Sequence, residues 1–128
     1  MRVLLDTCAF LWFIGGSERL SRPARDLMED FDNSLYLSLA SLWEIAIKIN
    51  IGKLELAQPF ATLIPEQLET HQIKLLQIHP DHLSRLLDLP LHHRDPFDRL
   101  IIAQAICERL PIISCDQNFP AYPVKLIW

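Results

Sequence analysis

The sequence is poor in glycine, in cysteine and in long apolar stretches, and each shortage excludes a class of protein. It has three glycines and neither G-x-G-x-x-G nor G-K-[S/T], so it lacks the usual phosphate-binding loops for dinucleotides and nucleoside triphosphates. Its longest apolar runs, such as 9–14, hold about six residues, whereas a membrane-spanning helix needs roughly 20. The three cysteines, Cys8, Cys107 and Cys115, show no C-x-x-C spacing, which favours reduced thiols over a disulfide framework.

Positive charge is scarce as well. The chain has 12 Lys and Arg against 16 Asp and Glu, a net charge of -4. That balance argues against a general nucleic-acid coat protein, which needs many basic side chains to neutralise phosphates. It does not exclude a nuclease, because a bound divalent cation brings its own positive charge to the phosphate. The length predicts one domain, 1–128, and the absence of a signal-like segment predicts a cytoplasmic protein without a membrane span.

Short apolar segments alternate with amphipathic ones along the chain. The segments that read as strands are 2–5, 35–38, 74–78, 112–114 and 124–127. The segments that read as helices are 7–14, 21–31, 41–50, 59–72 with a break at Pro65, 80–89 with Leu83, Leu86 and Leu87 facing inward, and 100–110 opened by 95–98. This alternation predicts a parallel sheet covered on both faces, hence a three-layer α/β domain.

Four acidic residues fall where such a sheet would bring them together. Asp6 and Asp116 directly follow the first and fourth strands, and Glu44 lies in the first turn of the helix after the second strand. Asp98 opens the helix before the fourth strand, so it reaches the same edge only if the loop 90–94 first returns there. Converging carboxylates are the oxygen ligands that Mg2+ or Mn2+ requires.

Each acid also has a purely structural interpretation. Asp6 can cap the following helix, and Glu44 completes an S-x-x-E capping box with Ser41. Asp98 can serve the helix dipole beside a capping Asp95, and Asp116 can be an ordinary turn residue. Only the joint pattern favours a metal site.

That joint pattern resembles a known family. The segments VLLDT, SLASLWEIAIKINIGKL, LPLHHRDPFDRLIIAQA and IISCDQNF together resemble the PIN-domain nucleases, and in particular the VapC-type toxins of bacterial toxin-antitoxin modules. The resemblance covers nearly the whole chain, and DPFDRLIIAQA is its most specific piece. It implies a sheet of order 3-2-1-4-5, core acids at Asp6, Glu44 and Asp98, and a fourth, less invariant acid at Asp116.

The resemblance further implies a Mg2+-dependent endoribonuclease toxin, a homodimer and a VapB-like antitoxin. In the mechanism we expect, Asp6 and Asp98 anchor Mg2+, for which Mn2+ can substitute, while Glu44 and Asp116 complete the shell and orient the attacking water. Preference for RNA rests on the resemblance. Three basic side chains that flank the acids in sequence are candidate phosphate contacts: Lys48, Arg94 and Arg99.

Two other classes of protein remain open on the sequence alone. A phosphohydrolase of the haloacid dehalogenase type also has an aspartate after its first strand. It requires a second acid two residues later, where this chain has Cys8. A noncatalytic interaction module would use the acids only as caps. The adjacent His92 and His93 match no zinc spacing and are predicted to be loop residues near the substrate.

Overall fold

The computed structural model describes all 128 residues and contains every predicted strand and helix. The strands are β1 (Arg2–Leu5), β2 (Ser34–Ser38), β3 (Lys74–Leu76), β4 (Ile112–Ile113) and β5 (Leu126–Ile127). The helices are α1 (Thr7–Ile14), α2 (Arg22–Glu29), α3 (Leu39–Asn50), α4 (Phe60–Thr70), α5 (Pro80–Asp88) and α6 (Pro96–Glu108), with a short 3-10 turn at Phe119–Ala121. None of these helices combines the length and the apolarity needed to cross a membrane.

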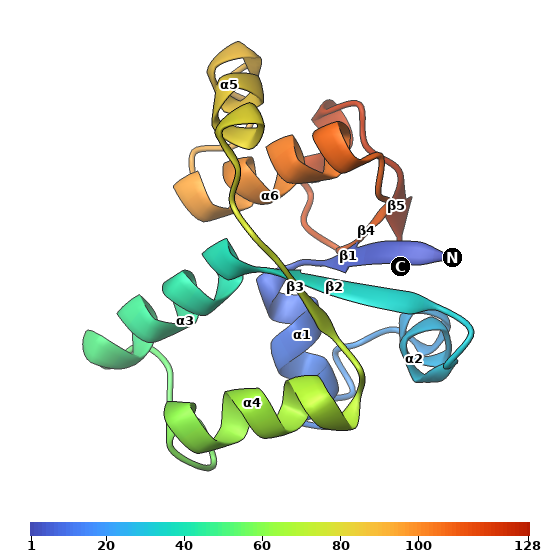
Figure 1. Cartoon of the computed structure of the whole chain (residues 1–128), viewed down its shortest axis with the longest axis vertical. Coiled ribbons are helices and arrows are strands. Elements are labelled where there is room, and N and C mark those ends of the chain that lie inside the picture. The colour runs from blue at the N-terminus through green and yellow to red at the C-terminus, as the bar shows by residue number, and fades with distance from the viewer.

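All five strands are parallel and lie in the order β3-β2-β1-β4-β5, which confirms the order implied by the family resemblance. In the central strand, Leu5 pairs with Leu37 on one side and with Ile113 on the other. The next residue continues the ladder, since the Asp6 amide donates to the Ile113 carbonyl at 3.1 Å. The carboxyl ends of β1, β2 and β4 therefore meet at one edge, on the left in Figure 1, where α3 and the start of α6 lie.

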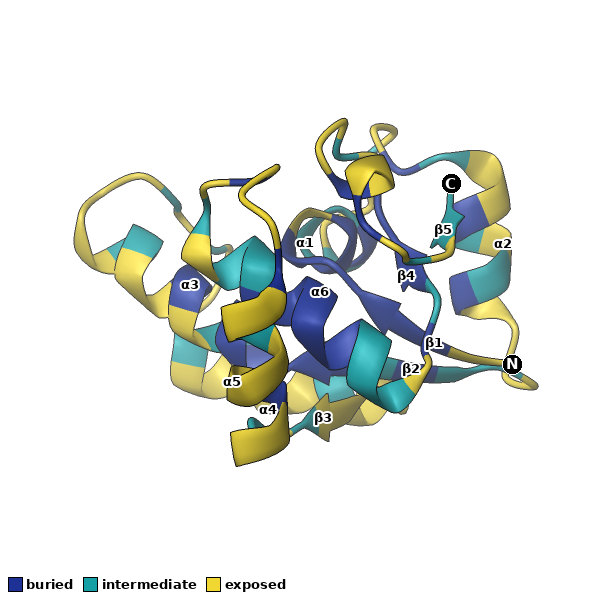
Figure 2. Ribbon diagram, turned by 90° about the horizontal axis from the view of Figure 1, so that it is seen from above, coloured by how far each residue is buried: buried dark blue, intermediate teal, exposed yellow.

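The sheet separates two apolar cores. α5 and α6 cover one face, and α1, α2 and α4 cover the other (Figure 1). Because side chains alternate along a strand, Val3 and Leu5 of β1 pack with the α1 side while Leu4 packs with the α6 side. β1 and much of α6 are buried, whereas α5 is mostly exposed (Figure 2). The three-layer prediction is confirmed.

One predicted helix start and one predicted helix break were wrong. α3 begins at Leu39 and not at Ser41, because Ser38 is the residue whose side chain caps it, accepting from the Ala40 amide at 3.0 Å. α4 also runs without a break through Pro65. The proline removes only the hydrogen bond to Ala61, and both residues are exposed, so water can satisfy the free carbonyl.

Of the three leucines predicted to face inward on α5, only Leu86 packs against the core, so the prediction was wrong for Leu83 and Leu87. Leu83 and Leu87 are 48% and 86% exposed, while His82 is buried at 1%. The side chain of His82 contacts Glu108 at the end of α6, and Arg99 at the start of α6 donates to the Leu89 carbonyl after α5. The two helices therefore form an antiparallel hairpin.

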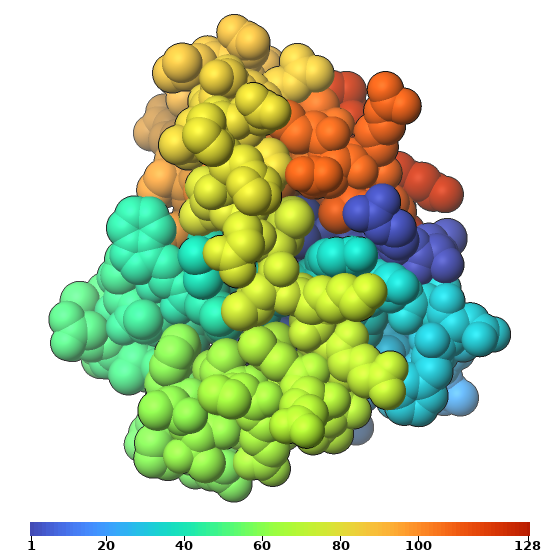
Figure 3. Space-filling view, viewed as in Figure 1, coloured from blue at the N-terminus to red at the C-terminus, as the bar shows by residue number.

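The α5–α6 hairpin brings the first turn of α6 to the carboxyl edge of the sheet. After β3 the chain crosses the surface from α4 toward α5, as Figure 3 shows. α5 then runs back along α6, and the loop 90–94 delivers the first turn of α6 to the edge where β1 and β4 end. Asp98 is thereby placed beside residues that follow those strands.

Candidate metal centre

Asp6 follows β1 directly and caps α1. One oxygen, Oδ1, accepts from the Ala9 amide at 2.7 Å, so the capping role suggested by the sequence is present. Capping engages one oxygen of the carboxylate and leaves acceptor capacity on Oδ2. The side chain is nevertheless almost wholly buried at the edge of the sheet. Asp6 is thus both a cap and a carboxylate that faces the other acids.

Glu44 has no capping role. The first turn of α3 is capped by Ser38, so the predicted box with Ser41 does not form. Instead the Thr7 hydroxyl donates to Glu44 Oε1 at 2.7 Å, and Lys48 Nζ, one turn along α3, donates to Oε2 at 2.7 Å. Thr7 Oγ1 also lies 2.9 Å from Ser41 Oγ. These contacts hold the buried Glu44 carboxylate between α1 and α3.

Asp98 projects from the first turn of α6 without capping it. Asp95 is the cap, as predicted, with Oδ1 accepting from the amides of Phe97 and Asp98 at 2.9 and 3.0 Å. Pro96 occupies the first helical position, where a missing N–H costs nothing. Because Asp95 satisfies the exposed amides, the carboxylate of Asp98 is free for other partners.

Asp116 lies in the turn after β4 and shares a partner with Asp98. Its Oδ1 accepts from the Asn118 amide at 2.8 Å, the turn role foreseen from the sequence. Its Oδ2 lies 3.0 Å from Nε2 of His93, and the same nitrogen lies 3.2 Å from Asp98 Oδ2. One imidazole therefore connects two of the acids.

The four predicted acids surround one hollow of about 290 Å3 at the carboxyl edge. The hollow is lined by Asp6, Thr7, Cys8, Trp12, Glu44, Lys48, Asp95, Asp98, Cys115 and Asp116. Segments separated by more than a hundred residues in sequence thus contribute to one site, as strand ends in a parallel sheet are expected to do.

Burial and neighbouring negative charges raise the proton affinity of two of the acids, Asp6 and Asp98. Burial raises the pKa of Asp6 to about 6, with Asp116 and Glu44 adding to the effect against hydrogen bonds from Ser114 and Ala9. Burial, followed by the charges of Asp95 and Glu44, raises the pKa of Asp98 to about 7. Charges held this close are stabilised when a cation enters.

The donor set fits a hard divalent cation. Carboxylate oxygens are the ligands that Mg2+ and Mn2+ prefer, and the lysine that lines the hollow is already paired with Glu44. The two thiols at the rim do not offer thiolates, because burial and Asp6 raise the pKa of Cys8 to about 11 and also raise the pKa of Cys115. A site for zinc would need such thiolates or several imidazoles.

The three basic side chains singled out from the sequence lie in different places. Lys48 lines the hollow, with its ammonium group on Glu44. Arg94 is exposed and does not line it. Arg99 is turned toward the end of α5, where it donates to the carbonyls of Pro90, Leu86 and Leu89 at 2.9, 3.5 and 3.3 Å. Of the three, Lys48 alone is placed to meet a phosphate at the acids.

His93 is the site residue that the sequence interpretation missed. It was grouped with His92 as a loop residue near the substrate, but it is buried and contacts two of the acids. Its position just before the R-D-P-F-D segment was the available signal. No spacing rule identifies it, because its orientation depends on Tyr122, whose hydroxyl oxygen accepts from the amides of both histidines.

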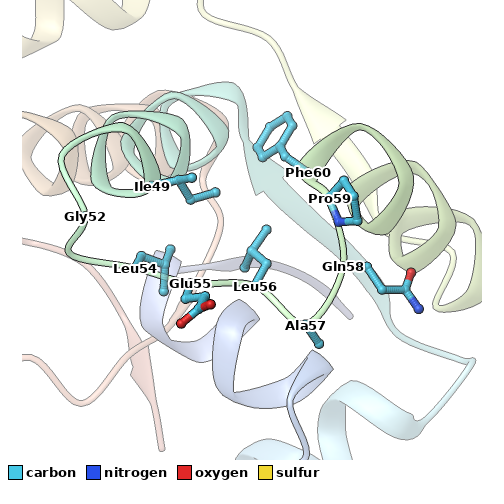
Figure 4. Close-up of a pocket in the computed structure, with 9 residues that line it drawn as sticks. All are labelled: Ile49, Gly52, Leu54, Glu55, Leu56, Ala57, Gln58, Pro59 and Phe60. Atoms are coloured by element: carbon cyan, nitrogen blue, oxygen red, sulfur yellow. The ribbon is translucent and has the colours of Figure 1, made fainter.

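A larger hollow elsewhere lacks such chemistry. It lies between the end of α3, the loop 52–59 and the start of α4, and has a volume of about 510 Å3. Ile49, Leu56 and Phe60 point toward one another across it (Figure 4). Glu55 is the one charged residue in its lining, so this surface, the α3–α4 groove, suits binding better than catalysis.

Comparisons with known proteins agree with the fold and identify a family. The family model described as PIN domain matches residues 3–125. A stretch of 44 residues, 34% of this chain, is 43% identical to Ribonuclease VapC16 of Mycobacterium tuberculosis, and it spans 31% of that protein's own length. The resemblance drawn from the sequence is confirmed.

Solved structures share the fold over nearly the whole chain. VapBC2 from Rickettsia felis, solved with a DNA fragment from its promoter, superposes with a TM-score of 0.72 at 15% identity, covering 99% of this chain and 98% of that one. VapBC-5 from Mycobacterium tuberculosis gives a TM-score of 0.62 at 20% identity, covering 98% and 97%. At such identities the likeness concerns the fold.

Proposed function

Because the chain belongs to the PIN-domain family, we propose that it is the toxin of a VapBC-type toxin-antitoxin module, a Mg2+-dependent endoribonuclease. The local match to Ribonuclease VapC16 and the fold shared with VapBC complexes support this proposal. The observation that carries it is the hollow at the carboxyl edge, where four carboxylates converge and the lysine is already paired. The proposal takes 1–128 as one catalytic domain.

Each acid has a part in the proposed hydrolysis. Asp6 and Asp98 would hold the metal, and Glu44 and Asp116 would complete its shell and orient the attacking water. Mg2+ bound there supplies Lewis acidity and lowers the pKa of a water molecule. A neighbouring carboxylate would accept the proton of that water as its oxygen bonds to phosphorus in line, while the opposite P–O bond breaks and the leaving ribose oxygen takes up a proton.

Recognition of the phosphate rests on few groups. The chain carries a net charge of -4, so general attraction to the RNA backbone is weak. Lys48 lies at the hollow and can move its ammonium group from Glu44 to a phosphate oxygen. Since water attacks the phosphorus, the reaction consumes no 2'-hydroxyl, and the preference for RNA follows from the family.

Two exposed apolar surfaces suit the proposed protein partners. α3 and the residue that follows it present Leu39, Trp43, Ile47 and Ile51 at a spacing of four residues, and each is more than a third exposed. A second copy of the chain would cover this stripe in a homodimer. The α3–α4 groove has the apolar lining that a segment of a VapB-like antitoxin would bury.

The proposal is tested by RNA cleavage. Purified protein is incubated with a mixed pool of structured RNAs in Mg2+, in EDTA, and as the variant Asp98→Asn in Mg2+. Glu108→Gln is the matched control, because it changes a carboxylate at the far end of the same helix. Cleavage lost in EDTA and in Asp98→Asn but kept in Glu108→Gln supports a metal-dependent ribonuclease at this site.

Two results would contradict the proposal. Cleavage that persists in Asp98→Asn would place the activity elsewhere. Absence of both cleavage and stabilisation by Mn2+ in the wild-type protein would leave the acids as structural residues of a noncatalytic interaction module.

A further inference from the structure

His93 is held from three sides. Its amide donates to Tyr122 Oη at 2.8 Å, its ring lies edge-on to Phe119 with centroids 5.7 Å apart, and its Nδ1 lies 3.1 Å from the Asp95 amide. Its Nε2 lies 3.0 Å from Asp116 Oδ2 and 3.2 Å from Asp98 Oδ2. The side chain is 10% exposed, so neither ring nitrogen depends on bulk water.

The neighbour of Nδ1 fixes where the imidazole carries its proton. A backbone N–H is always a donor, so Nδ1 must accept from Asp95 and therefore holds a lone pair. The single proton of the neutral ring is then on Nε2, the nitrogen that faces Asp98 and Asp116. Both carboxylates are acceptors when ionised, so this arrangement is complementary.

We infer that His93 is a positioning residue of the proposed ribonuclease, which donates its Nε2–H to Asp98 and Asp116 and is not itself a metal ligand. The inference rests on the proposed function, since it concerns how the acids of that site are held. It gives the fourth acid, which the resemblance marks as less invariant, a fixed orientation.

The rival role for His93 is ligation. Nε2 and the carboxylate oxygens of Asp98 and Asp116 all lie within 4.8 Å of one another, close enough for one ion. Ligation through Nε2 would need the lone pair there and would move the proton to Nδ1. Nδ1–H would then face the Asp95 N–H, two donors in contact, and the hydrogen bond at the start of α6 would be lost.

The hydrogen bond from His93 holds Asp116, which lies on a turn and not on a helix or strand. Asp116 lies on a turn that is anchored by Ser114 Oγ, which accepts from its amide at 3.0 Å, and its carboxylate is 29% exposed. Asp98 comes from a different element, and two ionised carboxylates repel. A shared donor between them lowers that repulsion and links the turn after β4 to α6. Removing a group that orients metal ligands in this way commonly weakens metal binding about 10- to 100-fold, and we expect a loss of this size for His93.

The test combines a spectrum of the wild-type protein with three variants. With 15N-labelled histidine, long-range 1H–15N NMR identifies which nitrogen of His93 is protonated before and after Mg2+ is added. Mn2+ affinity is measured by calorimetry for wild type, His93→Ala, His93→Gln and the matched control His92→Ala, which removes the exposed neighbouring ring. Circular dichroism establishes that each variant is folded.

We expect the proton to stay on Nε2 in Mg2+. We also expect His93→Ala to weaken Mn2+ binding about 10- to 100-fold, His93→Gln to recover part of the loss through its amide N–H, and His92→Ala to match wild type. A proton that moves to Nδ1 on adding Mg2+ would make His93 a ligand and overturn the inference. Wild-type affinity in a folded His93→Ala would also overturn it.

The proposed function can fail separately. Wild-type protein that binds Mn2+ yet cleaves no RNA would contradict the ribonuclease and leave the role of His93 intact. Wild-type protein that binds no Mn2+ would contradict both. If His93→Ala does not fold, the NMR result on wild type decides between donor and ligand by itself.

Discussion

Two buried histidines make the same contacts at two ends of the α5–α6 hairpin. In each ring Nδ1 accepts from a backbone amide, that of His79 for His82 and that of Asp95 for His93. In each ring Nε2 lies 3.0 Å from a carboxylate oxygen, on Glu108 and on Asp116 respectively. A common local arrangement thus appears once far from the acids and once among them.

The two histidine–carboxylate pairs, His82–Glu108 and His93–Asp116, have different surroundings and therefore different roles. Glu108 is a single carboxylate whose side chain is 35% exposed, so His82 closes a satisfied contact between two helices. His93 faces a second carboxylate, and behind these lie Asp6 and Glu44 in the same hollow. A buried histidine–carboxylate pair therefore stabilises packing where one carboxylate stands alone, as at Glu108, and orients carboxylates where several converge.

Removing one negative charge from the acids at the carboxyl edge should have the largest effect on RNA cleavage. Asp6→Asn keeps an oxygen that can cap α1, so the helix start survives while a metal ligand is lost. We expect RNA cleavage to fall by at least about 100-fold and the metal-free protein to become more stable. Cleavage assays with Glu108→Gln beside it provide the comparison, and equal losses in both variants would contradict a special role for the carboxyl edge.

Removing the His82–Glu108 contact should lower the stability of the fold and leave metal binding at the carboxyl edge unchanged. His82→Ala leaves a cavity and an unpaired His79 amide, and we expect it to lower the free energy of unfolding by about 2–4 kcal/mol. Urea denaturation measures this loss. Mn2+ affinity of the folded variant should equal that of wild type, and a clear loss of affinity would mean that the two histidine–carboxylate pairs are coupled through α6.

Proton binding at the acids should make the metal-free protein less stable as pH rises. The pKa values of Asp6 and Asp98 rise from 3.8 to about 6 and about 7 on folding. Their contribution to stability is therefore complete below about pH 4 and is lost as pH rises through 6 and 7.

In EDTA we expect the unfolding temperature to drop between pH 4 and pH 7, on the order of 5 °C, and Mg2+ or Asp98→Asn to reduce the drop. Scanning calorimetry at several pH values measures it. Identical pH profiles for wild type and Asp98→Asn would contradict a raised pKa of Asp98 in the folded protein.

The smallest expected effect concerns the one cation in the hollow. Lys48→Met removes the partner of Glu44 and leaves the apolar stem. Since a partly exposed ion pair contributes about 0.3–1 kcal/mol, Mn2+ should bind roughly two- to fivefold more tightly. Calorimetry with Mn2+ checks this, while RNA cleavage should decrease because a phosphate contact is lost. Weaker Mn2+ binding would mean that Lys48 orients Glu44 for the metal.

Much of this architecture was predictable because it depends on local signals. Apolar runs identified every strand, and Asp95 with Pro96 marked the start of α6 correctly. The positions of Asp6 and Asp116 directly after strands placed these two acids at one edge, whereas the placement of Asp98 depended on the path of the loop 90–94. The strand order came from family resemblance, since parallel strands of two to five residues carry no information on their neighbours.

The errors occurred where a distant partner decides. Ser38 rather than Ser41 caps α3, and its side chain is also bonded to Gln104 of α6, which no local pattern shows. α5 turns His82 inward in place of Leu83 because Glu108 lies beside it. His93 was underrated for the same reason, as its contacts come from Tyr122 and Asp116, more than twenty residues away.

The pairing of β1 with β4 also bears on when activity can arise during protein synthesis. β1 is made first, but one of its two neighbours, Ile112–Ile113, is made more than a hundred residues later. Until that segment leaves the ribosome, Asp116 is absent from the edge and β1 lacks a partner on one side. A nascent chain cannot assemble all four acids, so translation itself delays the appearance of a complete site in the cell that makes it.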